Sequence, residues 1–162
     1  MHGGSVYIIS RKIENINKAI KTLAEETGNT NVFGSSCDVR DEKQIEETVK
    51  LVVQKHGEID ILVNGAAGNF LCPFEQLSPN AFRTVLMIDT VGTFLLSKFT
   101  AKHAMKKGGV IINITANLHY SGTLLQAHAG TAKAGVDALT KHMAVELGPR
   151  GIRVIGVCPG AI

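Results

Sequence analysis

Short β-branched runs alternate with longer stretches of helical periodicity along almost the whole chain. Residues 5–10 (SVYIIS) show almost no alternation of polar and apolar side chains, which is typical of a strand buried on both faces. Between Ile13 and Leu23, apolar residues recur at spacings of three and four, which predicts an amphipathic helix that ends at Gly28. A strand followed by a helix is therefore the first structural unit.

The same unit recurs down the chain. Further strands are predicted at residues 31–37, 59–63, 110–114 and 152–157, all of them short apolar runs. Further helices are predicted at residues 41–56, 78–107 (with a break near residues 90–92) and 128–147. Strands that alternate with helices pair in parallel through right-handed crossovers, so the sequence predicts an α/β fold with a doubly wound parallel sheet.

The composition suits one packed domain and excludes several classes of partner. The 162 residues are 44% hydrophobic and 19% charged, and the net charge of +3 is spread along the chain. This excludes a dedicated nucleic-acid arm but permits an anionic ligand. No apolar run approaches the ~18 residues that a membrane span requires, so we expect neither nucleic acid nor membrane as a partner. Three widely spaced cysteines predict no disulfide framework and no metal site, and they fit a reducing compartment.

Polar and small residues follow each predicted strand, which is where doubly wound sheets bind their ligands. In chain order these segments are residues 10–12 (SRK), 38–40 (DVR), 64–70 (NGAAGNF), 115–120 (TANLHY) and 159–160 (PG). In addition, Lys133 lies in a helix rich in small residues. We therefore expect a ligand-binding site at this edge of the sheet.

This succession of segments resembles the short-chain dehydrogenase/reductase family. Four strings in the same order are most similar to its 2,4-dienoyl-CoA reductases of the peroxisomal type: residues 66–70 (AAGNF), 77–82 (LSPNAF), 87–94 (MIDTVGTF) and 128–139 (HAGTAKAGVDAL). The resemblance covers nearly the whole chain. It implies that residues 1–162 form a partial NADP-binding, Rossmann-like domain, running from the second to the sixth strand of the family fold.

The family's first strand, its G-x-G-x-x-G type loop and its C-terminal region have no counterpart in residues 1–162. Residues 2–4 (HGG) precede what resembles the second strand, so they cannot serve as that loop. We therefore expect a chain truncated at both ends. In the family, the absent strand lies between the strands that match residues 5–10 and 59–63. We expect an isolated monomer to be unstable, because the loss of a central strand removes two ladders of hydrogen bonds.

The expected cofactor is NADP(H). Arg11, with Ser10 beside it, follows a strand at the point where NADP enzymes place a cation for the 2′-phosphate, and no acidic residue stands there. By resemblance, Asp38 lies at the adenine. The remaining expected cofactor contacts are Val39, Asn64, Ala66, Lys133, Pro159, Gly160 and Ile162. The alternatives are a solvated helix start for Arg11 and a plain turn carboxylate for Asp38.

The expected substrate is an acyl-CoA. Arg11 and Arg40 are placed to meet its anionic phosphates, although Arg40 is equally consistent with a surface residue. By resemblance, the acyl-CoA side is lined by Phe70, Ser78, Pro79 and Asn80. Ser78 is also an adequate helix N-cap without any ligand.

The catalytic positions depart from the broad family. Carbonyl-reducing members have a Tyr four residues and a Ser seventeen residues before the Lys, and here Ala129 and Ala116 stand at those positions. The absent phenol argues against ketone reduction and agrees with dienoyl-CoA reductases, in which NADPH delivers hydride to the far end of a conjugated dienoyl thioester. By analogy, Lys133 binds the nicotinamide ribose, and our hypothesis is that Lys133, Asp89 and Asp137 hold the water that supplies the proton.

Two alternatives apply to these catalytic residues. Lys133 and Asp137 are also spaced as an i,i+4 ion pair of ~0.2–0.5 kcal/mol. His119 and Tyr120, which follow a predicted strand, are alternative proton donors.

The resemblance thus implies NADPH-dependent reduction of 2,4-dienoyl-CoA to 3-enoyl-CoA in β-oxidation of unsaturated fatty acids. One alternative is a carbonyl reductase such as a 3-oxoacyl reductase, and another is a non-catalytic chain that associates with full-length subunits. The two helices that usually build the family's oligomer interface are present, so a homo-oligomer is expected for the complete protein. The resemblance implies peroxisomes, although the end of the chain carries no S-K-L type signal.

Overall fold

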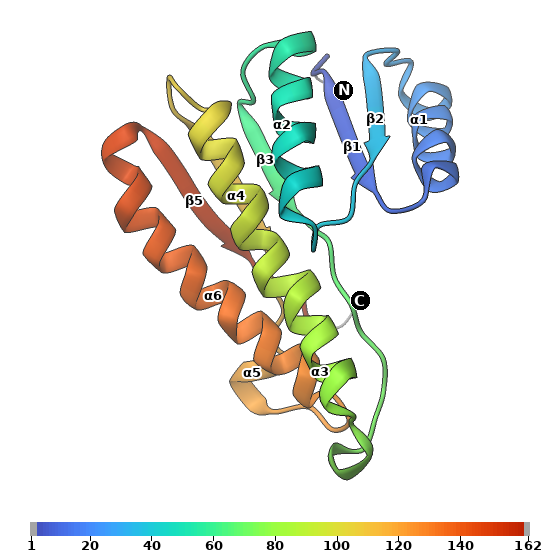
Figure 1. Cartoon of the computed structure of the whole chain (residues 1–162), viewed down its shortest axis with the longest axis vertical. Helices are drawn as coiled ribbons and strands as arrows, with labels where there is room; N and C mark the ends of the chain where they lie inside the picture. The colour runs from blue at the N-terminus through green and yellow to red at the C-terminus, as the bar shows by residue number, and fades with distance from the viewer. Residues whose placement is uncertain (1–2, 161–162) are drawn as a thin grey trace.

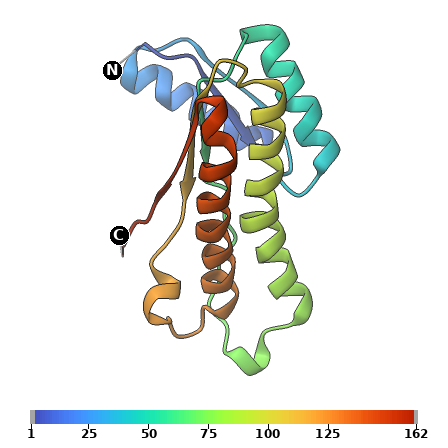
Figure 2. The ribbon, with the colours of Figure 1, turned by 90° about the vertical axis from the view of Figure 1, so that its left-hand side faces the viewer.

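A computed structural model describes residues 3–160 of the chain (Figures 1 and 2). Its strands are β1 (Val6–Ser10), β2 (Val32–Ser36), β3 (Ile61–Asn64), β4 (Gly109–Ile114) and β5 (Ile152–Val157). Its α-helices are α1 (Ile13–Thr27), α2 (Glu42–His56), α3 (Pro79–Leu86), α4 (Gly92–His103), α5 (Leu118–Ser121) and α6 (Ala127–Leu147). A π-helical turn, Met87–Val91, joins α3 to α4, and 3₁₀ turns lie at Phe74–Gln76 and Gly148–Arg150. The predicted alternation of strands and helices is confirmed.

All paired strands run parallel and form two sheets. β1 pairs with β2, from Val6 opposite Val32 to Ser10 opposite Ser36, and β4 lies between β3 and β5 in the second sheet. Among residues 3–160, β1 and β3 are each paired on one side only, and Figure 1 shows a break between them. The predicted α/β class with parallel strands is confirmed, and the break falls where the resemblance places the family's first strand.

Helices pack against one face of the β3-β4-β5 sheet. α6 contacts β5 and α4 contacts β3, and Figure 2 shows these two helices side by side. On the other face, Ile61 and Val63 of β3 are 60% and 55% exposed, and Ile155 and Val157 of β5 are also exposed. The apolar run at residues 59–63 is therefore not a strand buried on both faces, because the described helices cover only one face of β3.

The apolar core has two adjoining parts. The first joins the turn after β2 to α2 and α4 through Cys37, Ile45, Val49, Leu95, Leu96, Phe99 and Ala104. The second joins the end of α4 to β4 and β5 through Ala101, Met105, Ile111, Ile152 and Val154. Leu62 of β3 packs against both parts, so its strand is held from the helical side.

Most helix boundaries follow the predicted signals. Gly28 adopts a left-handed conformation (φ 69°) at the end of α1, and the Asp41 carboxylate accepts a hydrogen bond from the Gln44 amide at the start of α2 (3.0 Å). One boundary is wrong, because α4 ends at His103 and not at Lys107. Ala104 and Met105, each 1% exposed, turn into the core and end the helix early.

The helical segment Pro79–His103 passes without interruption through the π-turn. By length and composition alone it would be long enough and apolar enough to cross a membrane. About half of its apolar window (56%) is buried inside the structure, as in a core helix, so the membrane signal is weak. The π-turn occupies the region where the sequence predicts a break in this helix.

The π-turn packs closely against α6. A Cβ on Gly135 of α6 would lie 2.9 Å from the Thr90 methyl group, so the absence of a side chain permits this approach. The Thr90 hydroxyl donates a hydrogen bond to the Ala132 carbonyl (2.9 Å). These contacts fix Asp89, the residue before Thr90, opposite the N-terminal half of α6.

Candidate active site

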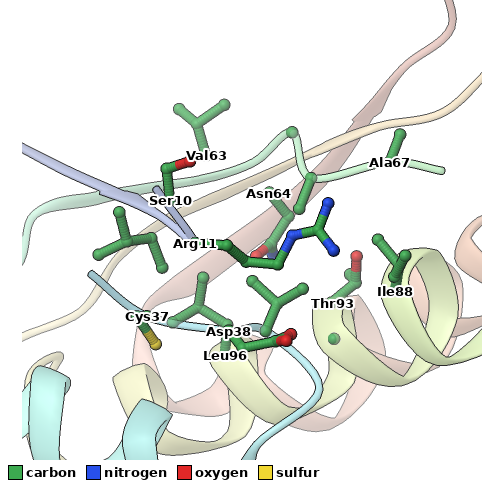
Figure 3. Close-up of a pocket in the computed structure, with 15 residues that line it drawn as sticks. Ser10, Arg11, Cys37, Asp38, Val63, Asn64, Ala67, Ile88, Thr93 and Leu96 are labelled. Carbon is green, nitrogen blue, oxygen red and sulfur yellow. The ribbon is translucent and has the colours of Figure 1, made fainter. Parts of the chain in front are cut away.

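A cavity of about 390 Å³ lies between the carboxyl ends of β1 and β3, the turn after β2, and the helical segment around residues 88–96 (Figure 3). Its walls consist of Ile9, Ser10, Arg11, Cys37, Asp38, Val39, Val63, Asn64, Gly65, Ala66, Ala67, Ile88, Gly92, Thr93 and Leu96. The carboxyl ends of β1, β2 and β3, which are far apart in sequence, therefore meet at this cavity, as expected of parallel strands whose carboxyl ends share one edge.

Six of the predicted cofactor contacts line this cavity: Ser10, Arg11, Asp38, Val39, Asn64 and Ala66. Lys133 lies on α6 and is not among the residues that line the cavity. Of the described residues, Pro159 and Gly160 follow β5 but are not among those that line the cavity, and Ile162 lies outside residues 3–160. The cofactor role of all these residues stays a prediction.

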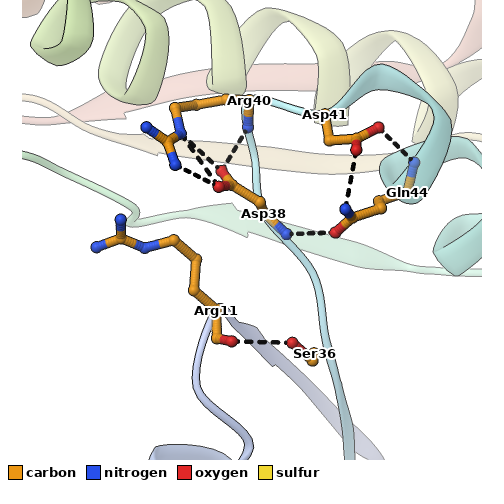
Figure 4. A network of polar contacts seen from close by, with 6 residues as sticks. All are labelled: Arg11, Ser36, Asp38, Arg40, Asp41 and Gln44. Atoms are coloured by element: carbon orange, nitrogen blue, oxygen red, sulfur yellow. Dashed lines mark hydrogen bonds and ion pairs between the residues drawn. The ribbon is translucent and has the colours of Figure 1, made fainter.

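Arg40 forms an ion pair with Asp38, one of the residues that line the cavity (Figure 4). The Arg40 Nε donates to both carboxylate oxygens of Asp38 (3.0 and 3.1 Å), and the Arg40 amide donates to Oδ1 (3.0 Å). Chiefly because of the hydrogen bonds from the Arg40 side chain, the pKa of Asp38 is lowered from its usual value. Arg40 is therefore bonded to a carboxylate of its own turn, and its predicted contact to a CoA phosphate stays a prediction.

The Arg11 side chain extends across the cavity (Figure 3), and among residues 3–160 it forms no ion pair within 4.0 Å. Its backbone carbonyl accepts a hydrogen bond from the Ser36 hydroxyl (2.9 Å), which ties the end of β1 to the end of β2. Arg11 thus offers the cavity a cation whose guanidinium is not engaged in a direct ion pair, although its charge helps to lower the pKa of Asp38.

Asp89 and Lys133 form a buried pair. The Lys133 Nζ lies 3.3 Å from the Asp89 Oδ2 and donates a hydrogen bond to the Ile114 carbonyl at the end of β4 (2.9 Å). The Asp89 Oδ1 accepts a hydrogen bond from the Gly68 amide (2.7 Å). Burial raises the pKa of Asp89, although the Gly68 amide and Lys133 oppose that rise. Asp89 is thus a carboxyl group suited to holding a proton at a higher pH than usual.

The third predicted catalytic residue, Asp137, has different partners. Its Oδ2 lies 2.9 Å from the His119 Nε2 and accepts a hydrogen bond from the Tyr120 hydroxyl (3.2 Å). This hydrogen bond to a carboxylate raises the pKa of Tyr120. Among residues 3–160, Lys133 and Asp137 form no ion pair within 4.0 Å, so the structure groups Lys133 with Asp89 and groups Asp137 with α5.

The predicted acyl-CoA residues lie on two segments. Phe70, in the loop after β3, stacks on the ring of His128 with a centroid separation of 4.1 Å. Ser78 caps α3 by accepting a hydrogen bond from the Ala81 amide (3.1 Å), and Pro79 and Asn80 form its first turn. Of the described residues, none of these four lines the cavity. The capping role of Ser78 is confirmed, and substrate contact by Phe70, Ser78, Pro79 and Asn80 stays a prediction.

Sequence reasoning did not single out Thr93, Gly92 or His128. Thr93 is 6% exposed and lines the cavity, and a Cβ on Gly92 would lie only 3.0–3.1 Å from Val39. Gly92 therefore lets the helix approach the turn after β2. These two residues belong to the string at residues 87–94, but their part in the cavity wall depends on how the π-turn orients the helix. His128 opens the string at residues 128–139, but its burial without a polar partner depends on tertiary packing.

Two comparisons with known proteins bear on this site. A protein-family model described as enoyl-(acyl carrier protein) reductase matches residues 1–162, the whole length of the chain. The chain belongs to the short-chain dehydrogenase/reductase family. The mouse peroxisomal 2,4-dienoyl-CoA reductase is 48% identical over 99% of this chain, and its counterpart from Saccharomyces cerevisiae is 43% identical over the same share. This short-chain dehydrogenase/reductase chain covers 55% and 56% of those two proteins, so it spans about half the length of the relatives it matches.

Solved structures of two dehydrogenases have the same fold as this chain. An NAD⁺-bound xylitol dehydrogenase superposes with a TM-score of 0.90 at 29% identity, over 97% of this chain and 61% of that protein. A gluconate 5-dehydrogenase from Burkholderia cenocepacia, in complex with NADP and tartrate, superposes with a TM-score of 0.89 at 25% identity. This match covers 98% of this chain and 62% of that protein. The fold therefore implies a cofactor of the nicotinamide dinucleotide class.

Proposed function

We propose that this chain carries the catalytic face of an NADPH-dependent 2,4-dienoyl-CoA reductase, which forms 3-enoyl-CoA in β-oxidation of unsaturated fatty acids. The observation that carries the proposal is the buried Asp89–Lys133 pair next to Ala129, a residue that has no phenol to donate. The reductases of mouse and yeast that share this sequence are both named as producing (3E)-enoyl-CoA.

The cavity fits the adenosine half of NADP(H). Small residues of the loop after β3, Gly65, Ala66 and Ala67, leave room for close approach of a ligand to the backbone. Arg11 supplies a planar cation with donors that match a phosphate, and the nearby Asp38 is already hydrogen-bonded to Arg40. Asp38, held ionised by Arg40, is an acceptor for an amino group such as that of adenine. These features favour NADPH over NADH.

Bound NADPH supplies the hydride, and the chain stabilises the negative charge that hydride transfer creates. Hydride addition at the far end of the diene moves this charge to the thioester oxygen. Lys133 places a positive charge near the reacting groups, and a hydrogen-bond donor to such an oxygen contributes about 2.7–4 kcal/mol of transition-state stabilisation. Asp89 and Lys133, which lie 3.3 Å apart, are placed to hold the water that returns a proton to the α-carbon.

The second candidate is a chain without activity that associates with complete subunits. The open edges of β1 and β3, and the exposed Ile61 and Val63 on β3, favour it. A carbonyl reductase is opposed by Ala116 and Ala129, which stand where a Ser and a Tyr would be needed. For the complete protein we propose a homo-oligomer, and peroxisomes as its compartment because the mouse and yeast relatives are named peroxisomal.

The decay of nicotinamide absorbance tests these candidates. We expect a complete family subunit that contains this chain, supplied with NADPH, to reduce a 2,4-dienoyl-CoA and to leave a 3-oxoacyl-CoA unchanged. The reverse preference would establish a carbonyl reductase. If residues 1–162 bind no NADPH but co-purify with a complete subunit of the family, the second candidate, an inactive chain that associates with complete subunits, is correct. The enzymatic proposal then fails.

A further inference from the structure

His128, in the first turn of α6, is fully buried (0% exposed), yet neither of its ring nitrogens has a hydrogen-bond partner among residues 3–160. A neutral imidazole carries one N–H donor and one acceptor, so both capacities are unused. Leaving a buried polar group unpaired is unfavourable, and such groups in native proteins usually have a specific cause.

The surroundings of His128 belong to the candidate active site. One face of the imidazole stacks on Phe70 (centroids 4.1 Å apart, rings 16° from parallel). A positive charge on His128 would lower the pKa of Asp89, so the ring is within electrostatic reach of that carboxyl group. His128 also directly precedes Ala129, the position at which carbonyl-reducing members carry their proton-donating phenol.

The other polar groups here are already engaged. Lys133 contacts Asp89 and the Ile114 carbonyl, and Asp89 accepts from the Gly68 amide. Among the described residues around Asp89, His128 combines complete burial with no polar partner. Its cover, Phe70, is 40% exposed and lies on a loop outside any helix or strand, so an entering ligand would meet Phe70 first.

We propose that His128 donates a hydrogen bond to the thioester oxygen of a bound acyl-CoA, and that the acyl group displaces the Phe70 ring from the imidazole. This inference rests on the proposed function, since it needs an acyl thioester in the site. His128 would then provide the donor that Ala129 cannot provide. No proton leaves the imidazole in this step, so its neutral form is sufficient.

Ring-nitrogen NMR of the ¹⁵N-labelled chain tests the contact directly, with hexa-2,4-dienoyl-CoA as the probe and free CoA as its control. We expect the thioester to shift the His128 ring nitrogens and free CoA to leave them unchanged. Binding of the thioester without such a shift would overturn the role of His128 while leaving the proposed function intact. If neither compound binds, the proposed function fails and this inference fails with it.

Two variants at the same position separate hydrogen bonding from packing. His128→Phe keeps a flat ring against Phe70 but removes the donor, and we expect it to bind the dienoyl thioester about tenfold more weakly, with binding of free CoA unchanged. His128→Gln restores a donor and should recover most of that loss. His142→Gln, at an exposed position of the same helix, is the matched control. Wild-type affinity in a folded His128→Phe variant would contradict the proposal, as would equal weakening of thioester and CoA binding.

Discussion

Lys133 on α6 and Asp89 in the π-turn form an ion pair whose side chains are only 10% and 1% exposed, with 3.3 Å between Nζ and Oδ2. Removing one partner of a buried pair leaves a charge without compensation. We therefore expect Lys133→Met to lower the free energy of unfolding by about 3 kcal/mol at neutral pH, as measured by urea denaturation. The matched control is Lys98→Met, which breaks the exposed Lys98–Glu42 pair (3.2 Å) and should cost less than about 1 kcal/mol. Equal losses of unfolding free energy in the two variants would show that the buried pair contributes no more to stability than the exposed one.

Gly135 is required for the close approach of α6 to the π-turn. Gly135→Ala places a methyl group 2.9 Å from the Thr90 side chain, a β-branched residue with little freedom to move. We expect a loss of about 1–3 kcal/mol in the free energy of unfolding and weaker NADPH-dependent activity, because Asp89 moves with the turn. Gly148→Ala meets no atom within 4 Å and should change stability by less than about 0.5 kcal/mol. If Gly135→Ala leaves the free energy of unfolding unchanged, the close packing of α6 against the π-turn does not require a glycine.

Asp89 should make stability depend on pH. Its pKa in the folded chain is raised by burial, so the folded state holds the proton more tightly than the unfolded state does. The stabilising effect is complete below the ordinary carboxyl pKa and is lost as the pH rises through the raised value. As the pH rises through this window, we expect the unfolding free energy of the wild type to decrease relative to that of Asp89→Asn, which cannot titrate. Denaturation at a series of pH values measures this change. A pH-independent difference would show that Asp89 titrates normally.

Arg11 should determine the preference between the two nicotinamide dinucleotides. Arg11→Ala removes the cation assigned to the 2′-phosphate, and a charge-assisted hydrogen bond of about 1.5–3 kcal/mol corresponds to roughly 10- to 150-fold weaker NADPH binding. Binding of NADH should stay within about twofold. Fluorescence titration with both dinucleotides measures this, and Lys12→Ala, at the exposed neighbouring position, is the control. If Arg11→Ala weakens both dinucleotides equally, Arg11 does not contact the 2′-phosphate.

The residues after the strands could be predicted because parallel strands deliver their carboxyl ends to one edge. Ser10, Asp38 and Asn64 line one cavity for this reason, although no local pattern connects them. The capping residues Asp41 and Ser78 were also predictable, since a cap is formed within four residues of sequence.

Other features depend on tertiary contacts that no local pattern specifies. Asp137 is four residues from Lys133 on α6, but the position of α5 gives it His119 and Tyr120 as partners. The exposure of Ile61 on β3 depends on which helices cover the sheet, and its apolar character alone suggests burial. The isolation of His128 likewise results from the packing of Phe70 over its ring.

Product analysis with deuterated NADPH tests the central claim most directly, namely that this site reduces a conjugated thioester without a phenol. A complete subunit that contains this chain is incubated with either a 2,4-dienoyl-CoA or a 3-oxoacyl-CoA, together with NADPH that carries deuterium at the transferred position, and the products are analysed by NMR. We predict 3-enoyl-CoA with deuterium at the far end of the former diene. Deuterium transfer to the carbonyl carbon of a 3-oxoacyl-CoA, with no transfer to the dienoyl thioester, would contradict the account.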